Sequence, residues 1–473
     1  MKTYMALDGL RWSRDSGSVH CNMPRSAVFG RSVGGVKTKN LFLLAVSYIF
    51  YGLFDVRFTA ILAFVTMVNY ITILALSRLG TQNRKIILTV GIVCSLLPLA
   101  FFKYTYFFLN DVLMIEGKIF GDIILPVGIS FFTFQALSYT IDIYRGKETK
   151  CPQFIDFALF VSFFPCVLSG PIERARNLMP QFMAKQKPDI YVIFNGVQVL
   201  LYGVFLKNVV AENVGWFTNS AFRDYQHGSG LAIILAVLLY SIQIYCDFAG
   251  YSNMAIGVGR MLGFDIRKNF DFPYFSSSIK MFWKKWHISL TSWFTEYVYI
   301  PLGGNRVSQI RWIVNILIVF LVSGFWHGAA WTFIIWGLIH GIYQIVEHYT
   351  MPKQETHSVV VKFFRGVLLY IVVSVAWLLF RSNTIYEAFD ILMHCVINPF
   401  GSIRELFTMQ FVLMAISVVL FVILEVVLYK RYVKMLEFSD RHISWANIAF
   451  VIVVVISIEL FGLSGTSFVY FQF

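Results

Sequence analysis

The strongest constraint in this sequence is a series of apolar runs, each about as long as a helix that crosses a membrane. A hydrocarbon core of about 30 Å requires roughly 20 helical residues. Runs of this kind fall at Phe58–Leu76, Ile86–Leu109, Ile123–Tyr144, Val192–Val210, Leu231–Cys246, Trp312–Phe325, Trp331–Val346, Val367–Phe380, Phe411–Tyr429 and Ile443–Leu460. With two shorter runs, Leu41–Phe54 and Phe154–Leu168, they predict an all-α, polytopic membrane protein with about 10–12 transmembrane or re-entrant helices.

Composition supports the same class. Of the 473 residues, 58% are apolar and 14% are charged, whereas soluble proteins average about 45–50% and about 25%. A soluble enzyme, a disordered chain and a disulfide-rich secreted module are therefore excluded. The formal net charge of +13 does not indicate nucleic-acid binding, because the basic residues gather in short breaks between apolar runs, as they do in cytoplasmic loops.

The charged breaks predict a topology. Basic breaks at 37–39, 145–150 and 430–441 are assigned to the inside, and the acidic break at 111–122 to the outside. This assignment leaves the C-terminus on the outer side. A full crossing by Phe154–Leu168 would place the next basic stretch, 174–187, on the outside. We therefore expect that run to be re-entrant, and irregular backbone at membrane depth indicates a cavity.

Two regions stand apart from the regular spans. Residues 1–39 are polar and lack the apolar core of a signal peptide, so we expect a polar tail before a single membrane domain over 40–473. Residues 251–311 interleave Lys and Arg with Phe and Trp, a pattern typical of helices that lie at the membrane interface or dip into it.

The first candidate for chemistry is His327. It lies between Trp326 and Trp331, near the middle of a stretch without Asp, Glu, Lys or Arg, Trp312–Val346. Ionisable groups inside a membrane are functional candidates by default. The nearby Gly324 and Gly328 have a simpler explanation in close helix packing, but that does not account for a histidine at this depth.

The second candidate is His287, which follows Lys284, Lys285 and Trp286; a solvated interfacial histidine would fit this context equally well. A buried neutral histidine can accept a proton from a hydroxyl, which acyl transfer to an alcohol requires. A proton relay in a transporter remains open. No metal site is expected, because the six cysteines form no CxxC pair and no HExxH motif is present.

At these residues the sequence resembles the membrane-bound O-acyltransferase (MBOAT) family, most closely its alginate O-acetyltransferase membrane-subunit branch. The resemblance extends over about 41–473 in order. Its motifs are Ser47–Gly52, Leu125–Gln135, Ser138–Tyr139, Asp142–Gly146, Gly170–Ile172 with Arg174, Pro180–Phe182, Gln243–Tyr245, Asp247–Phe248, Gly250–Ser252, Phe282–Trp283, Trp286–His287 with Ser289, Tyr299–Arg306, Gly324–Gly328 and Tyr470–Phe473.

The resemblance implies helices around a central tunnel, with His327 as the signature histidine and His287 as the second. The implied reaction passes an acyl group, usually acetyl, from a cytoplasmic donor such as acetyl-CoA towards an extracytoplasmic polysaccharide, often through an SGNH-hydrolase-like partner. It implies no permanently bound cofactor and places the chain in the bacterial inner membrane. The candidate tunnel-lining residues are Asp247, Tyr251, Trp286, Trp326 and Trp331. The candidate contacts for the CoA phosphates are Lys284, Lys285 and Arg306.

Two departures from the family pattern accompany this interpretation. Members of the branch usually begin with a hydrophobic helix before the Ser47 motif, so the polar residues 1–39 suggest a mis-set start or a missing first helix. Asn253 stands where relatives often carry Asp, and it receives no acid role. The alternative function is a secondary transporter or polysaccharide exporter that uses His327 as a proton site, for which internal repeats would be expected.

Overall fold

The structure is a computed structural model that describes residues 33–78, 83–115, 117, 119–148, 151–186, 189–351, 358–401, 408–427 and 443–463. Every regular element within these ranges is helical. Seven of the described helices are long and apolar enough to cross a bilayer. The all-α, polytopic membrane architecture predicted from the sequence is thus confirmed. The predicted topology of the 430–441 break and of the C-terminus concerns residues outside the described ranges.

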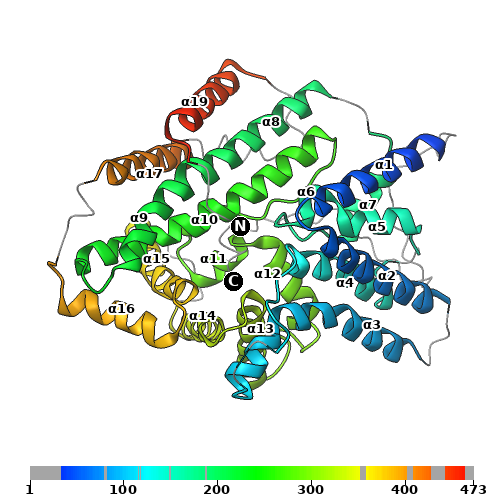
Figure 1. Ribbon diagram of the computed structural model, residues 1–473, viewed down its shortest axis with the longest axis horizontal. Coiled ribbons are helices and arrows are strands. Elements are labelled where there is room, and N and C mark those ends of the chain that lie inside the picture. The colour runs from blue at the N-terminus through cyan, green and yellow to red at the C-terminus, as the bar shows by residue number, and fades with distance from the viewer. Residues whose placement is uncertain are drawn as a thin grey trace, which may run out of the picture.

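The N-terminal part forms one side of the molecule (Figure 1). Its elements are α1 (Val33–Gly52), α2 (Val56–Arg78), α3 (Arg84–Leu99), the π-helical turns η2 (Ala100–Tyr104) and η3 (Phe107–Val112), and α4 (Ile129–Tyr144). Asn69 of α2 joins three of these helices, since its amide donates to Ser95 Oγ at 2.9 Å and accepts from Thr140 Oγ1 at 2.7 Å. Such polar contacts hold helices together where lipid offers no hydrophobic drive.

The short run Phe154–Leu168 does not form one continuous helix. It divides into α5 (Phe154–Ser162) and α6 (Phe164–Val167), followed by α7 (Ala175–Met183). Both ends of this segment meet the same end of α1. Asn40 donates to Asp156 at 2.8 Å near the start, and Lys39 donates to the carbonyls of Phe182 and Ala184 at the end. The segment from α5 to α7 thus begins and ends against the N-terminal half of α1, and the re-entry of Phe154–Leu168 stays a prediction.

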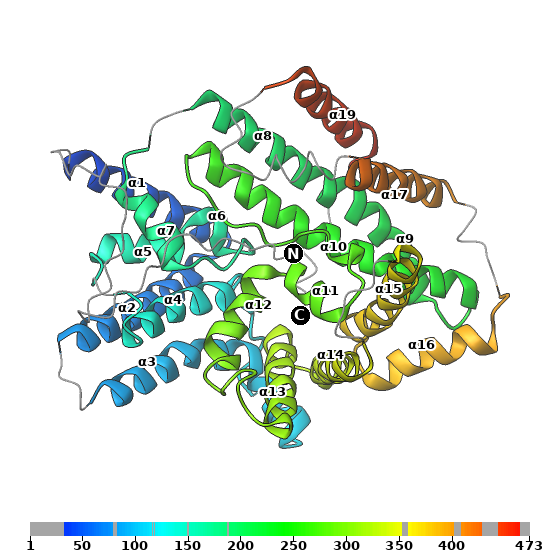
Figure 2. The same ribbon diagram turned by 180° about the vertical axis from the view of Figure 1, so that it is seen from behind.

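The centre of the fold is built on α8 (Ile190–Val204), η4 (Phe205–Ala211), α9 (Glu212–Arg223) and α10 (Gly230–Met261). Helices α8 and α10 run side by side in both views (Figures 1 and 2). Their backbones come close at glycines: a Cβ on Gly203 would lie 2.6 Å from the carbonyl oxygen of Gly250. The predicted span Leu231–Cys246 was too short, because α10 continues for 15 residues past Cys246 to Met261.

The extension of α10 escaped the hydropathy pattern because polar side chains are buried within it. Asp247, Ser252 and Asn253 are each at most 5% exposed, and Asp247 is ion-paired to Lys207 at 2.7 Å. A second difference concerns Ile123–Tyr144, where the helix begins only at Ile129. Gly128, with φ +76°, precedes it, and a Cβ there would collide with the carbonyl oxygen of Val167.

The remaining elements follow α10 in the chain. They are η5 (Pro273–Phe275), α11 (Ile279–Lys285), α12 (Ile288–Phe294), η6 (Thr295–Tyr299), α13 (Gln309–His327), α14 (Trp331–Thr350), α15 (Val359–Arg381), α16 (Ile385–Ile397), α17 (Met409–Val427) and α19 (Trp445–Phe461). Figures 1 and 2 show α11 and α12 near the middle of the molecule. Trp286 and His287 are each 1% exposed, so the alternative of a solvated histidine at position 287 is wrong.

Candidate active site

His327 is the last residue of α13, and only 4% of it is exposed. The chain leaves the helix at once, because Gly328 is extended. Three aromatic rings surround the imidazole, with centroids 4.9 Å away in Trp326, 5.2 Å in Trp336 and 5.3 Å in Phe380. The side chain predicted to be functional is thus buried among aromatic rings at a helix end.

A cavity of about 70 Å³ adjoins His327. It is lined by Lys103, Leu125, Pro126, Val127, Gly128, Ile129, Ser130, Phe131, Trp326 and His327. A larger cavity of about 440 Å³ shares Lys103 and Leu125 with the first and extends to the loop after His327 and to the end of α15. The two cavities therefore adjoin one another at Lys103.

Lys103 was missed in the sequence analysis, although it is the one charged residue in the sequence of the apolar run Ile86–Leu109. Its Nζ atom donates to the main-chain carbonyls of Trp326 at 2.9 Å and His327 at 2.7 Å. The hydroxyl of the next residue, Tyr104, donates to the carbonyl of Phe325 at 2.8 Å. Carbonyls at a helix C-terminus lack partners within the helix, so Lys103 and Tyr104 cap α13 at the candidate base.

His287 connects α11 to α12 in a left-handed conformation, with φ +43°. Its Nδ1 lies 3.1 Å from Asn269 Oδ1. Its ring packs against Phe248 with centroids 4.6 Å apart, and against Trp326 at 6.2 Å. Trp326 therefore contacts both candidate histidines, and the structure brings together two residues that are 40 positions apart in the sequence.

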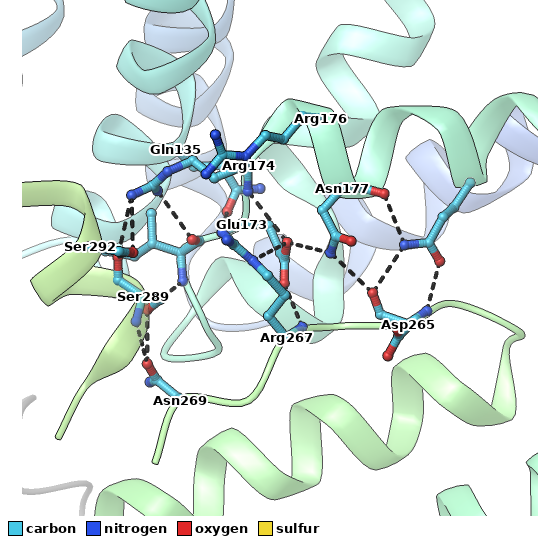
Figure 3. A network of polar contacts seen from close by, with 12 residues as sticks. Gln135, Glu173, Arg174, Arg176, Asn177, Asp265, Arg267, Asn269, Ser289 and Ser292 are labelled. Carbon is cyan, nitrogen blue, oxygen red and sulfur yellow. Dashed lines mark hydrogen bonds and ion pairs between the residues drawn. The ribbon is translucent and has the colours of Figure 1, made fainter. Parts of the chain in front are cut away.

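A polar network supports the loop that carries His287 (Figure 3). Ser289 Oγ donates to Asn269 Oδ1 at 2.9 Å and accepts from the main-chain N–H of Ile172 at 3.0 Å. Glu173 is fully buried and accepts from the N–H of Arg267 at 2.8 Å. The network thus joins the stretch between α6 and α7 to the histidine loop, a contact between distant segments that no motif revealed.

The outer edge of this network is ionic. Glu296 accepts a hydrogen bond from Arg176 at 2.7 Å, and the buried guanidinium of Arg174 lies 3.7 Å from the same carboxylate. Burial works against ionisation of Glu296, but the Arg176 hydrogen bond and the two guanidinium charges outweigh it and lower the pKa of Glu296. Glu296 is therefore held as an anion.

The other predicted tunnel-lining residues lie in different surroundings. Asp247 is ion-paired with Lys207, and the ring of Tyr251 lies 5.7 Å from the same ammonium group. Trp286 packs in the aromatic core, for example against Trp377 at 5.0 Å. Trp331 is 48% exposed at the start of α14. Their assignment to a tunnel stays a prediction.

The predicted phosphate contacts differ in exposure. Lys284 and Arg306 are exposed, and Lys285 is partly exposed. Within the described part of the chain, no group of three or more His, Cys, Asp or Glu residues is arranged to hold a metal ion. The described site thus consists of two buried histidines, a capping lysine and aromatic rings.

Comparison with known proteins supports the resemblance to the membrane-bound O-acyltransferase family. The profile of the MBOAT, membrane-bound O-acyltransferase family, matches residues 43–386. The chain is 37% identical to the probable alginate O-acetylase of Azotobacter vinelandii, covering 77% of this chain and 73% of that protein. It is 35% identical to the peptidoglycan O-acetyltransferase of Helicobacter pylori, covering 74% and 72%.

A more distant relative is the teichoic acid D-alanyltransferase of Streptococcus thermophilus, 29% identical over 49% of this chain and 58% of that protein. The family profile covers well over half of the 473 residues, including His287 and His327. An enzyme is therefore favoured over the transporter alternative. The chain belongs to the membrane-bound O-acyltransferase family and is an O-acyltransferase.

Proposed function

We propose that this protein passes an acetyl group from a cytoplasmic thioester to a polysaccharide outside the membrane, with His327 as the general base. The observation that carries the proposal is the position of His327 beside one cavity, which shares the lining residues Lys103 and Leu125 with a second, larger one. A hydroxyl acceptor and a thioester donor must meet beside the base in a site that excludes water, because thioesters hydrolyse readily.

The reaction then runs in two steps on these residues. The neutral imidazole of His327 takes the proton of the acceptor hydroxyl while the oxygen attacks the thioester carbonyl carbon. The tetrahedral intermediate collapses and the carbon–sulfur bond breaks. The sulfur takes the proton from the imidazolium and leaves as a thiol, which returns His327 to its neutral form. His287 supports this centre or contacts the thioester, since both histidines pack against Trp326.

The names of the relatives support the choice of substrates. The relatives are named for alginate, peptidoglycan and teichoic acid, which are all polymers, and two of them are named for O-acetyl transfer. We propose acetyl-CoA or a similar thioester as donor, an SGNH-hydrolase-like extracytoplasmic partner, and location in the bacterial inner membrane. Lys284, Lys285 and Arg306 are proposed to meet the donor phosphates at the cytoplasmic mouth, because exposed cations attract phosphate groups.

The test is the acetyl content of the cell-envelope and secreted polysaccharides in a strain whose only copy carries His327→Ala. The matched control is His340→Ala, which removes another buried histidine, packed 4.8 Å from Trp336. We expect acetylation to be lost in the first strain and kept in the second at equal protein levels. Wild-type acetylation in the His327→Ala strain would refute the proposal.

A further inference from the structure

We propose that Asn269 is a positioning residue that fixes the tautomer of His287, with the proton on Nδ1 and the lone pair on Nε2. The inference deepens the function proposed above and rests on the role given there to His287. Asn269 lies in the loop between α10 and η5 and is 1% exposed. Neither its type nor its spacing from His287 singled it out in the sequence.

The first step is the orientation of the Asn269 amide. Its Oδ1 accepts from the main-chain N–H of Ser289 at 3.2 Å. A main-chain N–H can only donate, so the group that faces it must be the amide oxygen and not the amide nitrogen. The Nδ2 group on the other side donates to Ser252 Oγ at 3.1 Å, which fits the same orientation.

The second step uses the orientation of the Asn269 amide to assign the proton on the imidazole. The oxygen whose orientation is fixed by Ser289 lies 3.1 Å from His287 Nδ1. A carbonyl oxygen can only accept, so Nδ1 must carry the proton to make a hydrogen bond. In the other tautomer, two acceptors would face each other at this distance in a buried site, which is unfavourable because neither is satisfied.

Ser289 Oγ offers the only competing donor that the described contacts place near Nδ1, at 3.5 Å. It lies closer to Asn269 Oδ1, at 2.9 Å, and already accepts from Ile172. The hydroxyl therefore gives its proton to Asn269 and leaves Nδ1 to donate. In this arrangement Asn269 Oδ1 accepts from three donors, which are the Ser289 N–H, the Ser289 hydroxyl and His287 Nδ1.

The third step concerns the nitrogen that remains. His287 Nε2 is buried and has no hydrogen-bond partner among the described residues. The ring that carries it packs against Phe248, Phe131 and Trp326. With Nδ1 protonated, Nε2 holds its lone pair in this aromatic pocket. It can then accept a hydrogen bond from a substrate or from a protonated group at the reacting centre.

Asn269 also holds the backbone of the loop. Its main-chain carbonyl accepts from the N–H of Ile288 at 2.8 Å, beside the left-handed φ of +43° at His287. A non-glycine residue persists in this region only where its surroundings impose it, and such strain gathers at functional sites. The contacts to Ser289 and Ile288 therefore fix where the His287 ring lies as well as which nitrogen is protonated.

The direct test is solid-state NMR of the full-length protein, labelled with ¹⁵N,¹³C-histidine, in lipid bilayers. The His287 signals are assigned from their loss in His287→Gln, and correlations to Cγ or Cδ2 distinguish Nδ1 from Nε2. We expect a protonated Nδ1 and an unprotonated Nε2 at neutral pH. An unprotonated Nδ1 in the wild-type spectrum would overturn the proposal without any variant.

Two substitutions extend the test. Asn269→Leu keeps the volume but removes the acceptor, so we expect a mixture of the two tautomers. Asn269→Asp keeps the acceptor and adds a negative charge, so Nδ1 stays protonated and the pH at which both nitrogens are protonated rises by about one unit or more. The matched control is Asn315→Leu, a buried asparagine that donates to Leu302 and Gly304 instead; it should leave the His287 signals unchanged.

Acyl transfer by the same variants separates this inference from the proposed function. If His287→Gln and His327→Gln both transfer acetyl groups at the wild-type rate, the proposed function fails whatever the tautomer is. If His287→Gln is inactive but Asn269→Leu keeps the wild-type kcat, pH profile and spectrum, the positioning role fails alone. The expected result is a loss in kcat on the order of 100-fold or less for Asn269→Leu, because the variant misplaces the His287 ring and does not remove it, with partial recovery in Asn269→Asp.

Discussion

The ammonium nitrogen of Lys103 lies 2.7 Å from the main-chain carbonyl oxygen of His327. Through this hydrogen bond, the π-helical turn after α3 holds the C-terminus of α13 in place. The lysine also lines both cavities that adjoin this helix end. Its position links the first third of the chain to the histidine on which the proposed chemistry depends.

Replacement of Lys103 by methionine should impair acyl transfer more than it impairs folding. The change keeps the length of the side chain but leaves the carbonyls of Trp326 and His327 without their donor. A displacement of the catalytic group by about 1 Å can cost on the order of 100-fold in rate, so we expect a loss of about 10- to 100-fold. The measurement is acetyl transfer at matched protein levels, with Lys362→Met on the exposed face of α15 as control. A wild-type rate for Lys103→Met would show that the cap is dispensable.

Substitution of Gly128 by alanine should destabilise the fold. Gly128 has φ +76°, and the new Cβ would collide with the carbonyl oxygen of Val167 in α6. Gly121→Ala is the matched control, since Gly121 has φ +69° but nothing within 4 Å of the added Cβ. In both variants the alanine must adopt a left-handed backbone conformation, which costs about 1 kcal/mol. Only in Gly128→Ala does the new Cβ also collide with the carbonyl oxygen of Val167. Size-exclusion chromatography after graded heating should show a lower Tm for Gly128→Ala, and equal values would contradict the close contact.

Gly324 should also be sensitive to a single methyl group. It faces α14, where an added Cβ would collide with the carbonyl oxygen of Phe333, so alanine should push the two helices apart three residues before His327. We expect lower Tm and lower acetyl transfer together. The control is Gly366→Ala on α15, where the new Cβ would meet only the carbonyl oxygen of Ser276 at 3.4 Å. If the two variants behave alike, α13 and α14 are less tightly packed than described.

The ion pair at Glu296 predicts a dependence of stability on pH. Arg176 and Arg174 lower the pKa of Glu296 below its usual 4.5. A depressed acid contributes stability that is complete above the unfolded pKa and is lost as the pH falls through the folded value. The Tm of the wild type should therefore fall more than the Tm of Glu296→Gln as the pH is lowered below about 5, just above the unfolded pKa, and on through the lower folded pKa. Asp111→Asn, at an exposed carboxyl, should retain the wild-type slope; a wild-type slope in Glu296→Gln would exclude the pair as its source.

The fold class could be predicted because apolar runs near 20 residues long have few alternatives in a bilayer. His327 could be singled out because an ionisable side chain between tryptophans is costly at that depth. The solvated alternative for His287 was wrong: Lys284 and Lys285 dominate the local pattern, although Trp286 and His287 are buried. Asn269 could not be found, since its role depends on a loop contact that spans 18 residues and carries no periodic signal.

Lys103, unlike Asn269, could have been singled out from the sequence. Its signal was present as a single charge inside the run Ile86–Leu109, where an ionisable residue indicates function. Its partners, the carbonyls of Trp326 and His327, lie more than 220 positions away. The sequence could therefore mark the residue as unusual but could not say which helix end it caps. The length of α10 was missed for a related reason, because buried polar groups such as Asp247 interrupt the hydropathy while their partners remain invisible.

The most direct test of the central claim is acetyl transfer across the membrane in inside-out vesicles. Vesicles that enclose the periplasmic contents receive [¹⁴C]acetyl-CoA on the outside, which corresponds to the cytoplasmic face. Label in the enclosed polysaccharide is then counted after external material is removed. With wild-type protein and with His340→Ala, we expect labelled polysaccharide inside; with His327→Gln, we expect none above the level of vesicles that lack the protein. Equal labelling by wild type and His327→Gln would contradict the account.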